Sequence, residues 1–161
     1  SSVGRLAAAE LQFEFVDTDE VIESRTGVKV GEIFEQHGET AFRKFEAELV
    51  AEMAEWSGKV ISTGGGLVVN LDNLASLKMH AFVVCLWATP DTIYQRTKHQ
   101  THRPLLQGSD APVKIRELLA AREAAYKQAD VLVNTEQRSI KEITAHVLHH
   151  FRAAQQSPPR L

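Results

Sequence analysis

The stretch Phe13-Glu14-Phe15-Val16-Asp17-Thr18-Asp19 is the part of the sequence from which the fold can be worked out. Its alternation of apolar and polar residues predicts a β-strand, which ends in two carboxylates. Acids just past the carboxyl end of a strand lie where open α/β sheets place their ligands, and residues two apart in extended backbone point the same way. Such a pair can divide the work between holding a hydrated metal ion and accepting a proton from a substrate hydroxyl. The alternative is that Asp17 and Asp19 only cap a helix that begins near residue 20, and the stretch alone does not separate the two.

The composition is that of an ordinary globular chain with one domain. The 161 residues are 43% hydrophobic and 24% charged, and the formal net charge is -3. This charge leaves no basic footprint for nucleic acid and no polybasic patch for a membrane, so small-molecule chemistry is favoured. The single cysteine, Cys85, lies in the apolar run 81–87 and is predicted to be a buried core thiol. Because the sequence shows no disulfide framework, signal-peptide pattern or membrane-spanning apolar run, we expect a cytoplasmic protein, and a monomer.

Strands and helices alternate along the chain, which predicts an α/β fold with a parallel sheet and helices on both faces. Further strands are expected at residues 59–63, 81–87 and 131–134, and helices at 1–11, 20–25, 30–37, 39–57, 71–78, 90–97, 112–129 and 139–151. The run 81–87 is almost entirely apolar, as is typical of a central strand covered on both faces. The first helix, with Ser1 as its cap, has no strand before it, so we expect residues upstream of Ser1 to be absent from this sequence.

Three consecutive glycines, Gly64-Gly65-Gly66, follow the strand 59–63. Such a run costs conformational entropy on folding, which is understandable where backbone amides must approach a ligand that a Cβ atom would block. A flexible turn is the alternative. Because the run lies between a predicted strand and the helix 71–78, we favour the ligand-facing interpretation.

Two arginines lie on predicted helices in different surroundings. Arg43 and Glu46 are three residues apart on one flank of helix 39–57, outside its apolar stripe, so they are predicted to form a solvated ion pair that contributes little stability. Arg122 falls inside the apolar stripe of helix 112–129, where a guanidinium either extends to the rim or faces a buried anion. From the residues alone, extension to the rim is favoured.

Residues 98–111 form a polar, basic connection that contains Arg103 and Pro104 and exceeds the usual loop length. Segments of this kind are typically lids or disordered, and we expect a mobile lid. At the end of the chain, the tail 154–161, with Pro158-Pro159, is expected to be frayed.

Several motifs follow one another in the sequence: Ser1-Ser2-Val3-Gly4-Arg5-Leu6, Phe15-Val16-Asp17-Thr18-Asp19, Phe42-Arg43 with Glu46, Thr63-Gly64-Gly65-Gly66, Arg103-Pro104-Leu105-Leu106, and Arg122 with Tyr126. Each is weak by itself, but in this order and at these spacings they resemble the shikimate kinase family, a small member of the nucleoside monophosphate kinase-like group of P-loop proteins. The resemblance covers almost the whole chain. It implies a three-layer α/β/α fold around a central parallel sheet, in one domain over residues 1–161 with a core of about 1–153. It also implies a small-molecule kinase that uses ATP and Mg²⁺ to transfer the γ-phosphoryl group to the 3-hydroxyl of shikimate, on the route to chorismate and the aromatic amino acids.

The resemblance implies roles for residues on the shikimate side. Asp19 matches the residue that hydrogen-bonds the shikimate hydroxyls and serves as, or positions, the catalytic base. Arg43 and Arg122 match the arginines that bind the shikimate carboxylate, which would explain why Arg122 lies in an apolar stripe. Gly65 and Gly66 match backbone contacts to shikimate.

The resemblance also implies roles on the nucleotide side. Ser1 and Asp17 match groups that reach Mg²⁺, Asp17 through water. Arg103 matches a lid arginine that moves onto the transferring phosphoryl group, and so joins Asp19 as a catalytic residue. Contacts to ATP are expected from Ser1, Ser2, Arg96, Arg103 and Arg138, with Arg96 and Arg138 flanking the adenine.

The sequence departs from the family pattern at its start. The family's phosphate-binding loop, G-x-x-x-x-G-K-[ST], would end at Ser1, and its glycines and lysine are not among the 161 residues. We expect this loop and the central first strand to lie upstream, since their loss would leave a hole in the sheet. If the loop is truly absent, the chain is instead a non-catalytic shikimate kinase-like binding module. Another small-metabolite kinase of the same fold, such as a gluconate kinase, is a further alternative, against which Arg43, Arg122 and the glycine run argue.

Overall fold

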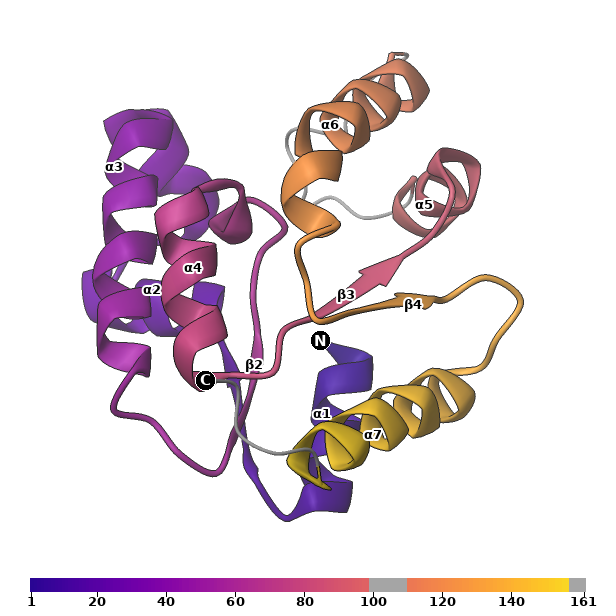
Figure 1. Ribbon diagram of the computed structural model, residues 1–161. Coiled ribbons are helices and arrows are strands. Elements are labelled where there is room, and N and C mark those ends of the chain that lie inside the picture. Colours follow the sequence, from indigo (N-terminus) through magenta and orange to yellow (C-terminus); the bar gives the residue numbers. More distant parts are fainter. Residues whose placement is uncertain (99–109, 157–161) are drawn as a thin grey trace.

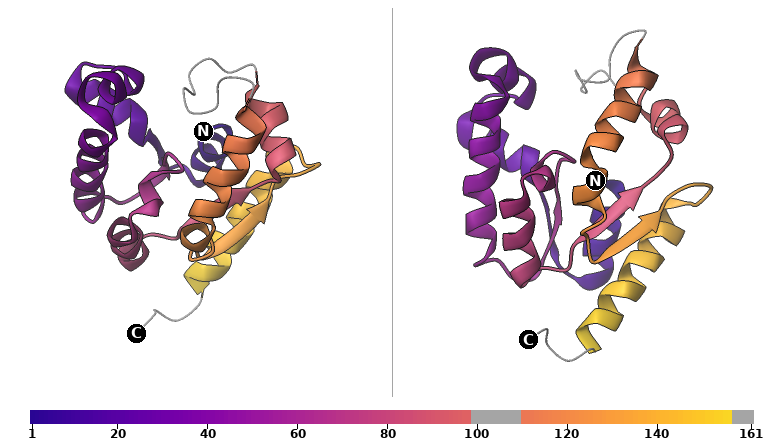
Figure 2. Two further views of the ribbon diagram at one scale, coloured as in Figure 1. Left: turned by 90° about the horizontal axis from the view of Figure 1, so that it is seen from above. Right: turned by 45° about the horizontal axis from the view of Figure 1, so that its top comes forward.

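The computed structural model describes residues 1–98 and 110–156, and Figures 1 and 2 show their arrangement. In chain order the elements are α1 (Ser2–Leu11), β1 (Glu14–Asp17), α2 (Thr18–Thr26), α3 (Val30–Met53), β2 (Lys59–Ser62), the 3₁₀ helix η1 (Leu67–Val69), α4 (Leu71–His80), β3 (Val84–Trp87), α5 (Pro90–Thr97), α6 (Ala111–Tyr126), β4 (Val131–Asn134) and α7 (Ile140–Gln156). Most of the predicted lid, including Arg103, lies outside the described residues, as do residues 157–161 of the tail. Within the described residues, no helix is long and apolar enough to cross a membrane.

The strands of the described residues form two parallel pairs. In the first, β1 pairs with β2, and the register runs from Glu14 opposite Lys59 to Asp17 opposite Ser62. In the second, β3 pairs with β4, as Figure 1 shows. No ladder joins β2 to β3 in the described part of the chain, which agrees with the expected hole in the sheet.

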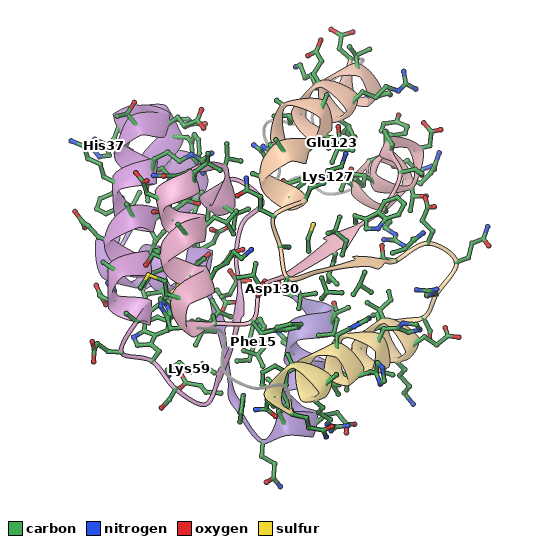
Figure 3. All side chains as sticks on the ribbon, in the orientation of Figure 1. Phe15, His37, Lys59, Glu123, Lys127 and Asp130 are labelled. Carbon is green, nitrogen blue, oxygen red and sulfur yellow. The ribbon has the colours of Figure 1, made fainter. Side chains whose placement is uncertain are left out.

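The pair of β1 and β2 is covered by helices on both faces. Phe15 and Val60 are register partners that lie against α1: a Cβ atom at Gly4 would be 2.9 Å from the Phe15 ring and 3.8 Å from Val60. The guanidinium of Arg5 lies 4.3 Å from the centre of the Phe15 ring, which Figure 3 labels beside α1. On the other face, Ile61 packs against the main hydrophobic core. The predicted arrangement of helices on both faces of a parallel sheet is therefore confirmed.

The main hydrophobic core lies between α2, α3, α4 and η1. Its buried members are Ile22, Ile33, Phe42, Leu49, Val50, Met53, Leu67 and Leu77. Figure 1 shows α2, α3 and α4 together on one side of the molecule, whereas α1 and α7 pack against each other on another. The apolar stripe predicted for the second half of α3 faces this core.

Strand β3 is shorter than the predicted strand 81–87. Its start is delayed because Ala81 still caps α4, where its N–H donates to the Leu77 carbonyl at 2.8 Å. The N–H of Val83 then donates to the Asp130 carboxylate at 2.7 Å instead of joining the ladder. Regular pairing therefore begins only at Val84.

The predicted burial of β3 on both faces is wrong. Leu86 is 44% exposed and Trp87 is 40% exposed. Cys85, predicted to be a buried core thiol, is only half-buried, although this burial still raises the pKa of its thiol. The physical reason is that, within the described residues, β3 has a strand neighbour on one edge only.

The predicted helix boundaries need two corrections. Gly38 does interrupt the helical backbone inside α3, with φ 75° and ψ 171°, but the second half ends at Met53 and not at residue 57. The Trp56 N–H donates to the Met53 carbonyl at 3.1 Å, so the chain leaves the helix in a turn. Similarly, α6 ends at Tyr126, and residues 127–129 form turns instead of the predicted helix.

Helix α7 begins as predicted but continues further. The Ser139 N–H donates to Glu142 Oε2 at 2.7 Å, and the Glu142 N–H donates to Ser139 Oγ at 3.3 Å, so the predicted capping box is confirmed. The helix extends to Gln156, and the prediction of a frayed tail is wrong for residues 154–156. Phe151 supports this end of α7, because its ring packs 6.4 Å from the centre of the Phe13 ring.

Candidate active site

Asp17 stands at the junction of β1 and α2 and accepts two hydrogen bonds. Its Oδ1 accepts from the Asp19 N–H at 3.1 Å, which makes Asp17 the N-cap of α2 and confirms the capping alternative for this residue. Its Oδ2 accepts from the Ser1 hydroxyl at 3.0 Å. Ser1 is the N-cap residue of α1, as predicted, but its side chain makes no capping hydrogen bond to that helix. The fold thus brings together the two residues that were expected to share Mg²⁺.

Asp19 lies in the first turn of α2, so the prediction that both acids lie in extended backbone is wrong. The chain becomes helical at Thr18 because Asp17 caps the helix. The Asp19 carboxylate nevertheless reaches the glycine run. A Cβ atom at Gly64 would lie 3.6 Å from Asp19 Oδ1 and 3.9 Å from Oδ2.

The ion pair of Arg43 and Glu46 is not solvated, which corrects the prediction. Arg43 Nη1 donates to Glu46 Oε2 at 2.7 Å, and the Glu46 side chain is only 1% exposed. Burial raises the pKa of the Glu46 carboxyl above its ordinary value, although the hydrogen bond and charge of Arg43 act in the opposite direction. The negative charge of Asp19 adds to the rise, so the two carboxylates are close enough to repel each other. The flank of α3 that carries this pair therefore faces the protein interior.

A second carboxylate holds the same guanidinium from its outer side. Arg43 donates to Glu39 Oε1 from Nε at 3.1 Å and from Nη2 at 2.7 Å. Burial alone would lower the pKa of Arg43, but its hydrogen bonds to Glu46 and Glu39 outweigh this effect and raise the pKa. Arg43 is thus a fully charged group held in one position, with 28% of its side chain exposed.

Gly66 and Arg43 approach each other so closely that no side chain fits at position 66. A Cβ atom there would lie 2.6 Å from Arg43 Nη2 and 2.7 Å from Cζ. The backbone of Gly66 has φ -86° and ψ -25°, which any residue can adopt. Glycine is required here by the guanidinium and not by the backbone conformation.

Gly65 is closed off in the same way by two residues of α6. A Cβ atom at position 65 would lie 2.7 Å from the Tyr126 hydroxyl and 3.5 Å from Arg122 Nη1. The Tyr126 hydroxyl donates to the Gly65 carbonyl at 2.9 Å. Arg122, half-buried, forms no ion pair with any described residue. Within the described residues, the Arg122 guanidinium therefore lies beside the glycine run without a carboxylate partner.

The glycine run is the place where three helices approach the connection from β2 to η1. Asp19 reaches it from α2, Arg43 from α3, and Arg122 from α6, while the run itself joins β2 to η1. At the run, the Leu67 N–H donates to the Gly64 carbonyl at 3.2 Å. One carboxylate and two guanidinium groups lie around this short length of backbone.

Arg96 and Arg138 come together at the loop between β4 and α7. Arg96 donates to the Thr135 hydroxyl at 2.8 Å and to the Thr135 carbonyl at 2.7 Å. Arg138 donates to the Asn134 carbonyl at 3.1 Å. Both arginines therefore donate hydrogen bonds from their guanidinium nitrogen atoms to this part of the chain. Arg103, the remaining predicted arginine, lies outside the described residues.

No group of three or more histidine, cysteine, aspartate or glutamate side chains in residues 1–98 and 110–156 could hold a metal ion. The Ser1 hydroxyl and the Asp17 carboxylate supply only two protein groups. This number still suits Mg²⁺ at a phosphate site, where the ion is typically held by one or two protein groups, phosphate oxygens and water.

Sequence reasoning missed the buried state of Glu46 and the roles of Glu39 and Tyr126 as contacts of the site. A signal was present for two of them. Glu39 precedes Arg43 by four residues, and Arg122 precedes Tyr126 by four, which places each pair on one face of a helix. No local pattern indicated that the loop at Gly66 would cover the flank of Arg43.

Comparison with known proteins gives a consistent result. The family model described as "Shikimate kinase" matches residues 1–152. The shikimate kinase of Symbiobacterium thermophilum is 42% identical over 155 residues, which cover 94% of this chain and 89% of the relative. The shikimate kinase of Thermodesulfovibrio yellowstonii is 39% identical over 151 residues, which cover 94% and 87%.

Solved structures agree with the sequence relatives. The structure of shikimate kinase from Acinetobacter baumannii in complex with shikimate matches with a TM-score of 0.90 and 33% identity, covering 96% of this chain and 87% of that chain. The crystal structure of shikimate kinase from Aquifex aeolicus matches with a TM-score of 0.83 and 32% identity, covering 98% and 92%. With this fold, the motif order and the site around the glycine run, the chain belongs to the shikimate kinase family.

Proposed function

We propose that this protein transfers the γ-phosphoryl group of ATP to the 3-hydroxyl of shikimate, giving shikimate 3-phosphate for chorismate and aromatic amino-acid biosynthesis. The observation that carries the proposal is the meeting of Asp19, Arg43 and Arg122 at the glycine run. A carboxylate and two guanidinium groups at one short backbone segment suit a small substrate that has both hydroxyl groups and a carboxylate. Membership of the shikimate kinase family supports the same substrate.

Arg43 and Arg122 bind the shikimate carboxylate in this proposal. Arg122 has its guanidinium free of carboxylate partners among the described residues, so it offers its donors to the substrate. Arg43 is held in place by Glu46, which is 1% exposed, and therefore keeps its position when the substrate enters. Backbone groups of Gly65 and Gly66 contact the ring of the substrate, which is possible because no Cβ atom stands in between.

Asp19 acts on the hydroxyl that receives the phosphoryl group. Its carboxylate accepts the hydroxyl proton while the bond from the hydroxyl oxygen to phosphorus forms and the bond from phosphorus to the ADP oxygen breaks. The negative charge of Asp19 contributes to the raised pKa of the Glu46 carboxyl, so the proposed base lies close to the residue that holds Arg43. The protein otherwise contributes mainly by position and charge, as is usual for phosphoryl transfer.

The nucleotide side of the proposal uses the residues around Ser1 and the β4–α7 loop. Ser1 and Asp17, whose oxygens are 3.0 Å apart, would hold Mg²⁺ together with phosphate oxygens and water. The ion, when bound, offsets the negative charge of the phosphates. Ser1 and Ser2 are proposed to contact the phosphates, Arg96 and Arg138 to flank the adenine, and Arg103, outside the described residues, to contact the transferring group.

The test is a turnover assay on the intact protein with ATP, Mg²⁺ and shikimate, and with gluconate as the competing acceptor. We expect phosphorylation of shikimate, and we expect Asp19→Asn to lower kcat by roughly 10²–10⁴-fold without loss of the fold. The matched control is Asp72→Asn, because Asp72 also lies in the first turn of a helix but its side chain is exposed. Full activity of Asp19→Asn would refute the role of Asp19. Binding of shikimate without any turnover would instead indicate a non-catalytic binding module.

We also propose that the protein is a single-domain monomer in the cytoplasm. The structure of the Acinetobacter baumannii shikimate kinase matches 96% of this chain in one alignment, which supports a single domain. Light scattering during size-exclusion chromatography of the intact protein measures the oligomeric state, and a mass of twice the monomer would contradict the proposal.

A further inference from the structure

Tyr126 joins the end of α6 to the glycine run through one hydrogen bond. Its hydroxyl donates to the Gly65 carbonyl at 2.9 Å, although the two residues are 61 positions apart in the sequence. The hydroxyl also fills the space in which a side chain at position 65 would start, since a Cβ atom there would be 2.7 Å away. The contact is therefore close, specific and dependent on glycine at position 65.

The bond acts on a peptide unit that has little else to define its orientation. The Gly65 carbonyl and the Gly66 N–H belong to one planar trans peptide, in which they point in opposite directions. Between two glycines such a unit can rotate with few steric restrictions, because neither residue has a Cβ atom. Holding the carbonyl toward Tyr126 therefore turns the Gly66 N–H toward the opposite side.

The other carbonyls of the run are also engaged within the protein. The Leu67 N–H donates to the Gly64 carbonyl at 3.2 Å, and the Val69 N–H donates to the Gly66 carbonyl at 3.1 Å. Only the bond to Gly65 comes from a side chain and from a distant element. Tyr126 thus completes a pattern in which all three carbonyls of the glycine run accept hydrogen bonds from the protein.

We propose that Tyr126 is a positioning residue for the acceptor substrate. It holds the Gly65–Gly66 peptide so that the Gly66 N–H faces the substrate, and it ties α6 to the run so that Arg122, one helical turn earlier, stays beside it. This inference rests on the proposed function, because it concerns how the same site binds shikimate. It adds a residue that contacts the backbone of the site and not the substrate itself.

The test compares Tyr126→Phe with the unaltered protein in calorimetric titrations of shikimate and of ATP, and in steady-state kinetics. Loss of one neutral hydrogen bond corresponds to about a fivefold change in affinity. We expect the KM and Kd for shikimate to rise by about that factor, with the KM for ATP unchanged and the melting temperature lowered by no more than a few degrees, as the loss of ~1 kcal/mol implies. A merely structural tyrosine would instead change the KM for both substrates alike.

Lys127→Gln is the matched control at the same end of α6. Lys127 and Glu123, which Figure 3 labels, form an exposed ion pair at 2.6 Å that does not involve the glycine run. Removing this pair disturbs the last turn of α6 but leaves the Tyr126 hydroxyl in place. We expect shikimate affinity to stay as in the unaltered protein, and an equal loss in both variants would overturn the proposal.

A double variant keeps the proposal testable if single changes affect folding. Gly65→Ala places a methyl group against the Tyr126 hydroxyl, whereas the next ring carbon would be 3.8 Å away, at ordinary contact distance. Adding Tyr126→Phe to Gly65→Ala should therefore restore the melting temperature but not the affinity for shikimate. Shikimate affinity of Tyr126→Phe equal to that of the unaltered protein overturns the positioning role. If the unaltered protein itself fails to bind shikimate, the proposed function has failed, and faster amide exchange at Gly66 in Tyr126→Phe still tests the peptide orientation.

Discussion

Replacing Gly66 by alanine should displace Arg43, which is proposed to bind the shikimate carboxylate, and leave the rest of the site in place. The added methyl carbon would lie 2.6 Å from Arg43 Nη2 and 2.7 Å from Cζ, whereas ordinary contact begins at 3.4 Å. The guanidinium would have to withdraw by at least 0.8 Å, the difference between 3.4 Å and 2.6 Å. It has no free direction in which to do so, because Nη1 is bonded to the buried Glu46 and Nη2 to Glu39.

The expected loss of shikimate affinity follows from the contact between Arg43 and the shikimate carboxylate, which the substitution disturbs. A charge-assisted hydrogen bond contributes ~1.5–3 kcal/mol, which corresponds to a loss of about 10- to 150-fold in affinity. The backbone of Gly66 is in the right-handed helical region, so alanine adds no conformational strain of its own. The change should therefore weaken shikimate binding strongly while leaving the fold and ATP binding nearly unaltered.

Calorimetric titration of shikimate and of ATP measures the two affinities, with Gly31→Ala as the control. Gly31 lies in the same helix as Arg43, and a Cβ atom there would meet nothing within 4 Å. Gly31→Ala should leave both affinities unchanged and should stabilise the fold by roughly 0.5–1 kcal/mol. In the Arg43→Ala background, Gly66→Ala should cost little more, because the group it displaces is gone. Normal shikimate affinity of Gly66→Ala, or an additive loss in the double variant, would refute the reasoning.

Three further predictions concern the charged groups. Arg43→Ala and Arg122→Ala should each weaken shikimate binding by ~1.5–3 kcal/mol and ATP binding far less, as calorimetry can measure; equal losses for both ligands would indicate general damage. Because the pKa of Glu46 is raised, the contribution of its protonated form to stability is fully present below the ordinary pKa of 4.5. This contribution is lost as the pH rises through the raised pKa. The melting temperature of Glu46→Gln should therefore rise relative to that of the unaltered protein as the pH rises. The opposite trend would contradict the burial of the charge. Arg96→Ala should release Thr135 and weaken ATP binding more than shikimate binding, which a fluorescence titration with a nucleotide analogue can check.

Local structure could be predicted because short-range patterns carry it. The strand at Val131–Asn134 has the predicted bounds, and Asn70 caps α4 by accepting from the Asp72 N–H at 2.9 Å. Gly27 ends α2 in the left-handed conformation, with φ 70°. Each of these features depends on a few neighbouring residues, so sequence reasoning was sufficient.

Burial of charged groups could not be predicted in this way. The apolar stripe of α3 indicates which side faces other helices, but it does not show that the loop at Gly66 covers the flank of Arg43. For that reason a solvated ion pair was expected where Glu46 is buried. The incomplete cover of Cys85 was missed for a related reason, since burial of a strand depends on neighbours that are distant in the sequence.

By itself the sequence determined the α/β class, the order of most elements and, through its motifs, the family to which the chain belongs. It also named the acids, arginines and glycines of the site. Only the tertiary structure decided that Asp19, Arg43 and Arg122 meet at one glycine run, and that each missing Cβ atom there makes room for a particular side chain. The physical reason is that such distances are set by how α2, α3 and α6 pack around β2 and η1, and packing between distant segments leaves no mark in any local pattern of residues.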